Sequence, residues 1–116
     1  MTTTKNIGDR GEDLAVQYLN AGGYKILEQK YRFKRSEIDI IAEKDDFIVF
    51  VEVKSRKSNL FGNPEEFVDF KKAEMIHLAA EEYLDGKPLE KPIRFDIISI
   101  IDKGSSHTIE HFKDAF

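Results

Sequence analysis

Hydrophobic residues are concentrated in a few short segments whose spacing predicts the secondary structure. Residues 47–51 (FIVFV) are apolar at every position, which is typical of a central β-strand covered on both faces. The segments 36–43 and 47–54 flank the short polar break 44–46, so they predict a β-hairpin. Further strands are predicted at 93–101, which is buried, at 24–33, as an edge strand or extended segment, and at 107–112, as an optional short strand.

The first helix is predicted over residues 9–20, where Ala15, Val16 and Leu19 form one apolar stripe. Glu12 stands three, four and seven positions before these residues, so it lies in line with the stripe rather than opposite it. That position is unusual for a glutamate whose only role is to face solvent.

A longer helix is predicted over residues 64–84, with Pro64 at its start and Gly86 after its end. The predicted order of elements is αβββαβ, with the optional strand last. This order indicates an α/β fold in which helices flank a mixed central sheet.

Composition bounds the class of protein. A chain of 116 residues, 41 % hydrophobic and 34 % charged, suits one globular domain over 1–116. It contains no cysteine, no apolar run of membrane-spanning length and no apolar signal-peptide core, which favours a cytoplasmic protein without membrane contact. The net charge of −4 argues against binding nucleic acid through bulk electrostatics, but basic residues clustered at 30–35 and 54–57 allow a local basic patch.

Charged residues follow the apolar part of the central strand. Hairpin geometry predicts which residues of the neighbouring strand lie opposite them. A two-residue loop at 45–46 places Asp39 opposite Glu52 and Glu37 opposite Lys54. Two carboxylates facing each other across a strand pair repel, so a compensating charge is expected.

A hard divalent cation, Mg²⁺ or Mn²⁺, would compensate Asp39 and Glu52, with the backbone carbonyl of Val53 and waters as further ligands. Lys54 would then stand beside a metal-bound water or a substrate phosphate, an arrangement that suits phosphodiester hydrolysis. The alternative is a Glu–Lys pair at a strand end that is solvated or weakly ion-paired. The additional acids Glu12 and Glu37 favour a site.

The combination of 37-EID-39, 52-EVK-54 and a preceding helical Gly11-Glu12 resembles the PD-(D/E)XK nuclease superfamily. More closely, it resembles the YraN-like bacterial family, whose fold is similar to archaeal Holliday-junction resolvases and restriction endonucleases. The matching residues cover nearly the whole chain: Gly11-Glu12, Tyr31-Arg32, 37–42, 50–56, Phe61-Gly62, Lys72, 83–84, 94–98 and 109–116.

The resemblance implies that Asp39 and Glu52 are metal ligands, that Lys54 is the catalytic lysine and that Glu12 is an accessory catalytic acid. Glu12 is also expected to hold the metal together with Asp39 and Glu52, and Glu37 is a further candidate ligand.

Two positions depart from the pattern of the family. Ser36 stands where glycine usually precedes EID, and Lys30 stands where asparagine commonly precedes Tyr-Arg. Neither change removes a catalytic group.

Three functions follow from these observations. The first is a Mg²⁺-dependent endonuclease that acts on branched or structured DNA in repair or recombination, as a homodimer if it cuts two strands. The second is a non-catalytic nucleic-acid-binding module, and the third is a protein-interaction domain, which the acidic balance favours. Six basic residues are candidates for contact with phosphates in the first two: Arg32, Lys34, Arg35, Arg56, Lys57 and Lys72.

Overall fold

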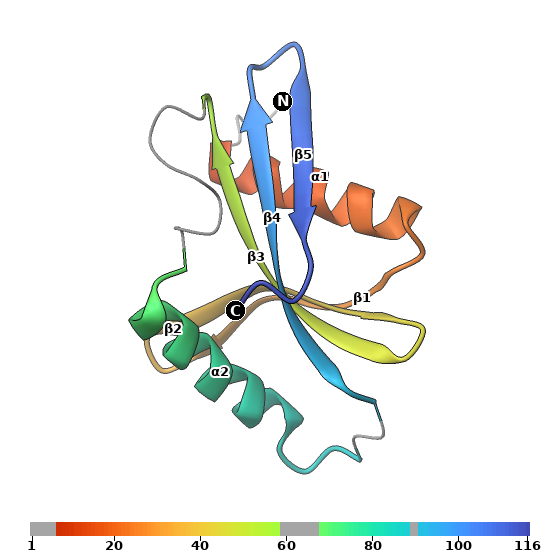
Figure 1. The fold of residues 1–116 in the computed structure, drawn as a ribbon, viewed down its shortest axis with the longest axis vertical. Coiled ribbons are helices and arrows are strands. Elements are labelled where there is room, and N and C mark those ends of the chain that lie inside the picture. The colour runs from red at the N-terminus through yellow and green to blue at the C-terminus, as the bar shows by residue number, and fades with distance from the viewer. Residues whose placement is uncertain (1–6, 59–67, 89–90) are drawn as a thin grey trace, which may run out of the picture.

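The computed structural model describes residues 7–58, 68–88 and 91–116, and its strands form one five-stranded sheet in the order β1-β2-β3-β4-β5 (Figure 1). Neighbouring strands are antiparallel except for the parallel pair β3 and β4, whose crossover contains α2. The predicted αβββαβ order and the optional last strand are confirmed. The elements are α1 Ile7–Ala21, β1 Lys25–Phe33, β2 Ser36–Lys44, β3 Phe47–Arg56, α2 Phe70–Leu84, β4 Ile93–Asp102 and β5 His107–Phe112.

The β2–β3 hairpin has the predicted register near its loop. Lys44 pairs with Phe47, and the ladder continues without a shift to the pair Ile40 and Val51. Asp45 in the loop has a φ of 50°, a left-handed conformation that aspartate adopts more readily than most residues. The prediction that 47–51 is a central strand is also confirmed, since β3 lies between β2 and β4.

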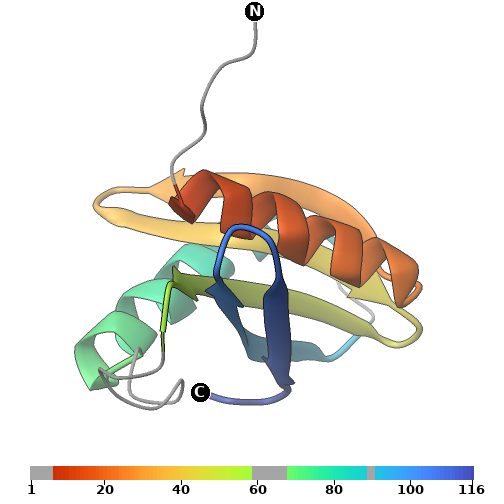
Figure 2. The same cartoon turned by 90° about the horizontal axis from the view of Figure 1, so that it is seen from above.

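The two helices cover opposite faces of the sheet (Figure 2). On the α1 face, buried side chains of α1 pack on alternate residues of β2, β3 and β4, and on the α2 face those of α2 pack on β2 and β3. This two-sided coverage explains why the middle of β3 is apolar throughout. The cluster on the α1 face includes Ala15, Leu19, Ile40, Val49, Val51, Ile98 and Ile100, and the cluster on the α2 face includes Ile38, Ile41, Phe50, Ile76 and Ala79.

The start of α2 differs from the prediction. Asp69 is the N-cap, and its side chain accepts a hydrogen bond from the backbone N–H of Lys72 at 2.8 Å, so the helix begins at Phe70. An aspartate cap therefore sets this boundary, and the predicted start at Pro64 lies outside the described residues, as does the matched pair Phe61-Gly62. Neither helix in the described ranges is long and apolar enough to cross a membrane.

Close contact between α1 and β3 depends on Gly11. A Cβ built on this residue would lie 1.7 Å from the Oγ and 2.7 Å from the Cβ of Ser55. Only glycine allows the helix to approach the strand this closely. The same approach brings the next residue, Glu12, towards the sheet.

Replacing Gly11 by alanine should therefore lower the free energy of unfolding by about 1–3 kcal/mol, the usual cost of overpacking. Gly22→Ala is the matched control, because a Cβ there would meet only ordinary contacts at 3.5 Å. Urea unfolding measures both, and adding Ser55→Gly to Gly11→Ala should restore part of the loss. Equal stability of the two alanine variants would contradict the tight helix–strand contact.

Candidate metal centre and active site

The candidate site lies where β2 and β3 separate. Their recorded pairing ends at Ile40 and Val51, and beyond it the backbone N–H of Val53 donates to Asp39 Oδ2 at 2.7 Å. The side-chain alternation of β2 also breaks here, since Ile38 packs on the α2 face and Ile40 on the α1 face. Asp39 thus replaces a backbone partner at a local break in the sheet.

Three of the predicted acids come together at this break. Carboxylate oxygens of Glu12, Glu37 and Asp39 all lie within 4.8 Å of one another, and each side chain is partly buried. Glu12 is contributed by α1, and the other two acids by β2. An all-carboxylate group of this size fits a hard divalent cation, which prefers oxygen ligands.

The fourth predicted acid, Glu52, lies outside this three-acid group. It is buried, at 8 % exposure, and its Oε1 accepts a hydrogen bond from Lys72 Nζ at 2.7 Å. Lys72 belongs to the first turn of α2, so Glu52 points to the α2 face. Glu52 is nevertheless close enough for its charge to raise the pKa of Asp39.

Glu37 does not take the place that simple hairpin geometry gave it. The prediction set it opposite Lys54, but it lies with Glu12 and Asp39, and Arg32 Nη1 is 3.5 Å from its Oε2. The break in alternation at Asp39 explains the difference, because the regular pairing does not extend past Ile40.

Burial and like charge shift both central acids towards the protonated form. Burial, followed by the charge of Glu52, raises the pKa of Asp39 to about 7, against the opposing hydrogen bond from Val53. Burial also raises the pKa of Glu52, although Lys72 and Lys54 oppose this shift. Binding of a positive charge at these acids, whether a proton or a cation, is therefore favourable.

Lysine side chains already supply some of that charge. Lys30 Nζ is 2.8 Å from Glu12 Oε2 and 3.4 Å from Asp9 Oδ1, and the hydrogen bond to Glu12 is the main reason that the pKa of Lys30 is raised. Lys30 has a φ of 53° in the middle of β1. Asparagine tolerates this left-handed conformation better than lysine does.

Two of the six predicted phosphate-binding residues, Arg35 and Lys72, line a hollow beside the acids. This hollow lies between the β1–β2 turn and the start of α2, and its lining includes Arg35, Glu37, Lys71 and Lys72. The remaining basic candidates lie at different depths. Arg32, Lys34 and Lys57 are exposed, and Arg56 is partly buried.

A buried polar network that the sequence did not predict is centred on Asp96 of β4. Asp96 is fully buried and accepts hydrogen bonds from Arg94 Nε and Nη2, His111 Nε2 and the backbone N–H of Asp114, at 2.7–3.0 Å. Burial acts to raise the pKa of Asp96, but the bonds from His111 and Arg94 outweigh it and lower the pKa. The network fixes β4, β5 and the C-terminal residues beside Val51, and the aspartate within the apolar run 93–101 was its only sequence signal.

The metal-free protein should lose stability as the pH rises from about 4 to about 7. The fold raises the pKa of Asp39 from 3.8 to about 7, so in this range the folded state holds a proton that the unfolded state has released. Asp39→Asn keeps an acceptor for the Val53 amide and should remove most of the loss, whereas Asp46→Asn in the exposed loop should not. Urea unfolding in chelator across this range measures the effect, and identical pH profiles for wild type and Asp39→Asn would contradict it.

Comparison with known proteins places the chain in a family. The model of the Uncharacterised protein family UPF0102 matches residues 11–100. The chain is 44 % identical to a UPF0102 protein of Flavobacterium psychrophilum over 100 % of this chain and 98 % of that protein. It is 46 % identical to UPF0102 proteins of Dictyoglomus turgidum, over 97 % and 98 %, and of Thermodesulfovibrio yellowstonii, over 95 % of each chain. The chain therefore belongs to the UPF0102 family.

Proposed function

We propose that this protein is a metal-dependent nuclease that hydrolyses phosphodiester bonds. The observation that carries the proposal is the convergence of Glu12, Glu37 and Asp39 within 4.8 Å at a break in the sheet. Buried Glu52 adds a fourth acid nearby, and Lys54 is close enough for its charge to lower the pKa of Glu52. A binding module or a structural domain has no need to concentrate acids that repel one another.

The four acids have separate parts in this proposal. Glu12, Glu37 and Asp39 would hold Mg²⁺ or Mn²⁺, with Glu52 as a further ligand once Lys72 releases it. A bound divalent cation supplies Lewis-acid activation of water and stabilises charge on the phosphate.

The two lysines act on the substrate in this proposal. Lys54 extends from the strand end next to Glu52, so its ammonium can donate to a non-bridging phosphate oxygen and orient the scissile group. Lys72, once released from Glu52, can neutralise a second phosphate oxygen as a point charge.

The proposed substrate is nucleic acid, with branched or structured DNA as the class that the PD-(D/E)XK resemblance suggests. Basic residues beside the acids support it, because Arg35, Lys71 and Lys72 line the hollow that adjoins Glu37. Exposed Arg32 and Lys34 extend this positive charge along β1 and its turn. Cutting two strands of a junction would require a homodimer, and the proposed setting is the cytoplasm.

A protein-interaction domain is the second candidate. The net charge of −4 favours it, as do two exposed apolar side chains on α2, Phe70 at 84 % and Leu78 at 53 % exposure. This candidate does not explain why acids are clustered and buried at the strand ends.

Cleavage of a labelled panel of DNA and RNA substrates tests the nuclease proposal. The panel contains a four-way junction, a flap, a duplex and single strands, each incubated with Mg²⁺ or Mn²⁺. Asp39→Asn and Lys54→Ala should each lower the rate by about 10²–10³-fold, because each removes a group that stabilises developing charge. Asp46→Asn and Lys113→Ala, which change the same charges at exposed positions, are the controls.

Chelator should abolish the cleavage, and the substrate that is cut fastest defines the class. Cleavage that persists in chelator or in Asp39→Asn would overturn the proposal. Absence of cleavage together with tight binding of a protein partner at α2 would favour the second candidate.

A further inference from the structure

One face of the sheet continues from Glu52 along β3 to the end of that strand. In β3, Lys54 and Arg56 alternate with α1-facing residues and so share the face of Glu52. The parallel register aligns Arg56 with Ile101 of β4, and the antiparallel register aligns Ile101 with Thr108 of β5. The residues on this face therefore form a strip that leads from Glu52 to the turn between β4 and β5.

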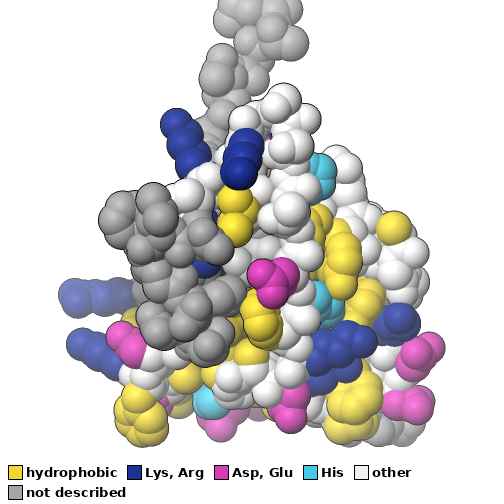
Figure 3. All heavy atoms as spheres, turned by 45° about the horizontal axis from the view of Figure 1, so that its top comes forward, with side chains coloured by type: hydrophobic (Ala, Val, Ile, Leu, Met, Phe, Trp, Pro, Cys, Tyr) yellow, Lys and Arg dark blue, Asp and Glu magenta, His cyan; other side chains and the backbone are white. Residues whose placement is uncertain are grey.

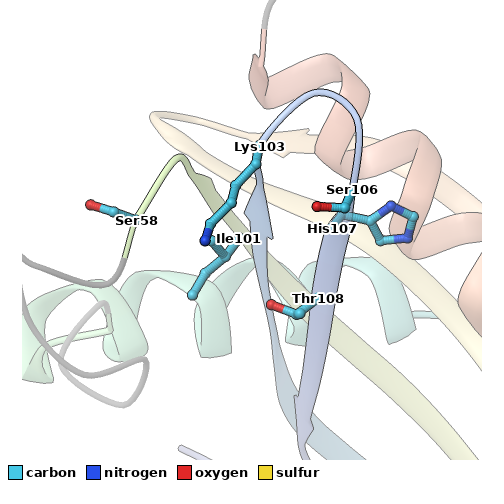
Figure 4. A pocket seen from close by; sticks show the side chains of 6 residues that line it. All are labelled: Ser58, Ile101, Lys103, Ser106, His107 and Thr108. Atoms are coloured by element: carbon cyan, nitrogen blue, oxygen red, sulfur yellow. The ribbon is translucent and has the colours of Figure 1, made fainter.

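A pocket lies at the end of this strip. It is lined by Ser58, Ile101, Lys103, Ser106, His107 and Thr108. Figure 4 shows the Lys103 side chain folded back from the turn towards Ile101, with the hydroxyls of Ser106 and Thr108 directed to the same space. The His107 ring points away from Lys103.

The turn that carries these groups is held in one conformation. The backbone N–H of Lys103 donates to the carbonyl of Ser106 at 2.9 Å, and Gly104 has a φ of 87°, which glycine tolerates without strain. Arg10 of α1 anchors the turn from below: its Nε is 2.8 Å from Oδ2 of buried Asp102, and its Nη2 donates to the carbonyl of Gly104 at 2.8 Å. The turn that carries most of the pocket is thus tied to α1.

We propose that this pocket binds a backbone phosphate of the nucleic acid whose scissile phosphate lies at the acids, an inference that rests on the proposed function. A compact ammonium and the two hydroxyl donors of Ser106 and Thr108 suit a phosphodiester, and no acid is among the described lining residues. Ser58 follows Glu52 by six residues, so the pocket is at most roughly 20 Å from Glu52 at the rise of an extended chain. This distance corresponds to about six base pairs of a duplex arm.

The charges around the pocket are mainly positive, which favours binding of a phosphate. Figure 3 shows Lys and Arg side chains at the end of the molecule where β3 ends and the β4–β5 hairpin turns. In the described part of the chain, Lys103 Nζ has no ion-pair partner. On this face of the sheet, the strand register places Glu110 closest to the pocket among the acids. Glu110 is exposed and pairs with Ser99.

Binding measured without cleavage tests the assignment. Fluorescence anisotropy of a labelled four-way junction in chelator gives the dissociation constant as a function of salt. Lys103→Ala should weaken binding by about 3–10-fold and reduce the slope of log K against log salt by about one, as expected for one lost phosphate contact. Lys113→Ala, which removes the same charge at the opposite end of β5, should leave the slope unchanged, and Glu110→Gln should strengthen binding.

Arm length adds a second readout. Shortening the junction arms to about four base pairs should abolish the difference between wild type and Lys103→Ala, because the DNA then ends before the pocket.

Three results would overturn the assignment: an unchanged salt slope in Lys103→Ala, an equal loss in Lys113→Ala, or no binding by the wild type. The first two leave the nuclease proposal intact if the junction is cut. A wild type that neither binds nor cuts the junction removes both.

Discussion

The hydrogen bond from the Val53 amide to Asp39 is the constraint on which the rest of the site depends. Where the β2–β3 pairing ends, Val53 needs an acceptor, and the carboxylate of Asp39 provides it at 2.7 Å. This bond holds an acidic group partly buried against β3, next to Glu52 and within reach of Glu12 on α1. If β2 and β3 continued their regular pairing, a backbone carbonyl would accept from the Val53 amide and the Asp39 side chain would not be held there.

The charge that results from this arrangement determines the surrounding contacts. Glu12 is neutralised by Lys30 and Glu52 by Lys72, both at the edge of the site, while Asp39 accepts a proton at a pH near 7. Each contact offsets repulsion among acids that the fold brings together. A single divalent cation bound among the acids would offset the same repulsion. The positions of the two lysines and of the proton therefore indicate where positive charge is most favourable. Gly11 contributes by letting α1 approach β3 closely enough to bring Glu12 there.

Periodicity predicted the order of elements, the central strand and the hairpin register, because alternation and a short polar loop are local signals. The start of α2 was wrong, since the cap Asp69 stabilises that boundary through one side-chain bond that periodicity does not register. The grouping of Glu37 with Glu12 followed from a break in alternation at Asp39, which depends on packing against both helices. The pocket at Lys103 was not predicted, because it is formed by a hairpin turn and a strand end that are distant in sequence.

Titration of Mn²⁺ into the protein above the pKa of Asp39 tests most directly whether the clustered acids form a cation site. We expect one site by calorimetry, at least about tenfold weaker in Asp39→Asn and unchanged in Asp46→Asn. Lys72→Gln should tighten binding, because it frees Glu52 from its ion pair. Equal Mn²⁺ affinity in wild type and Asp39→Asn would contradict the account, and the acids would then serve only the fold.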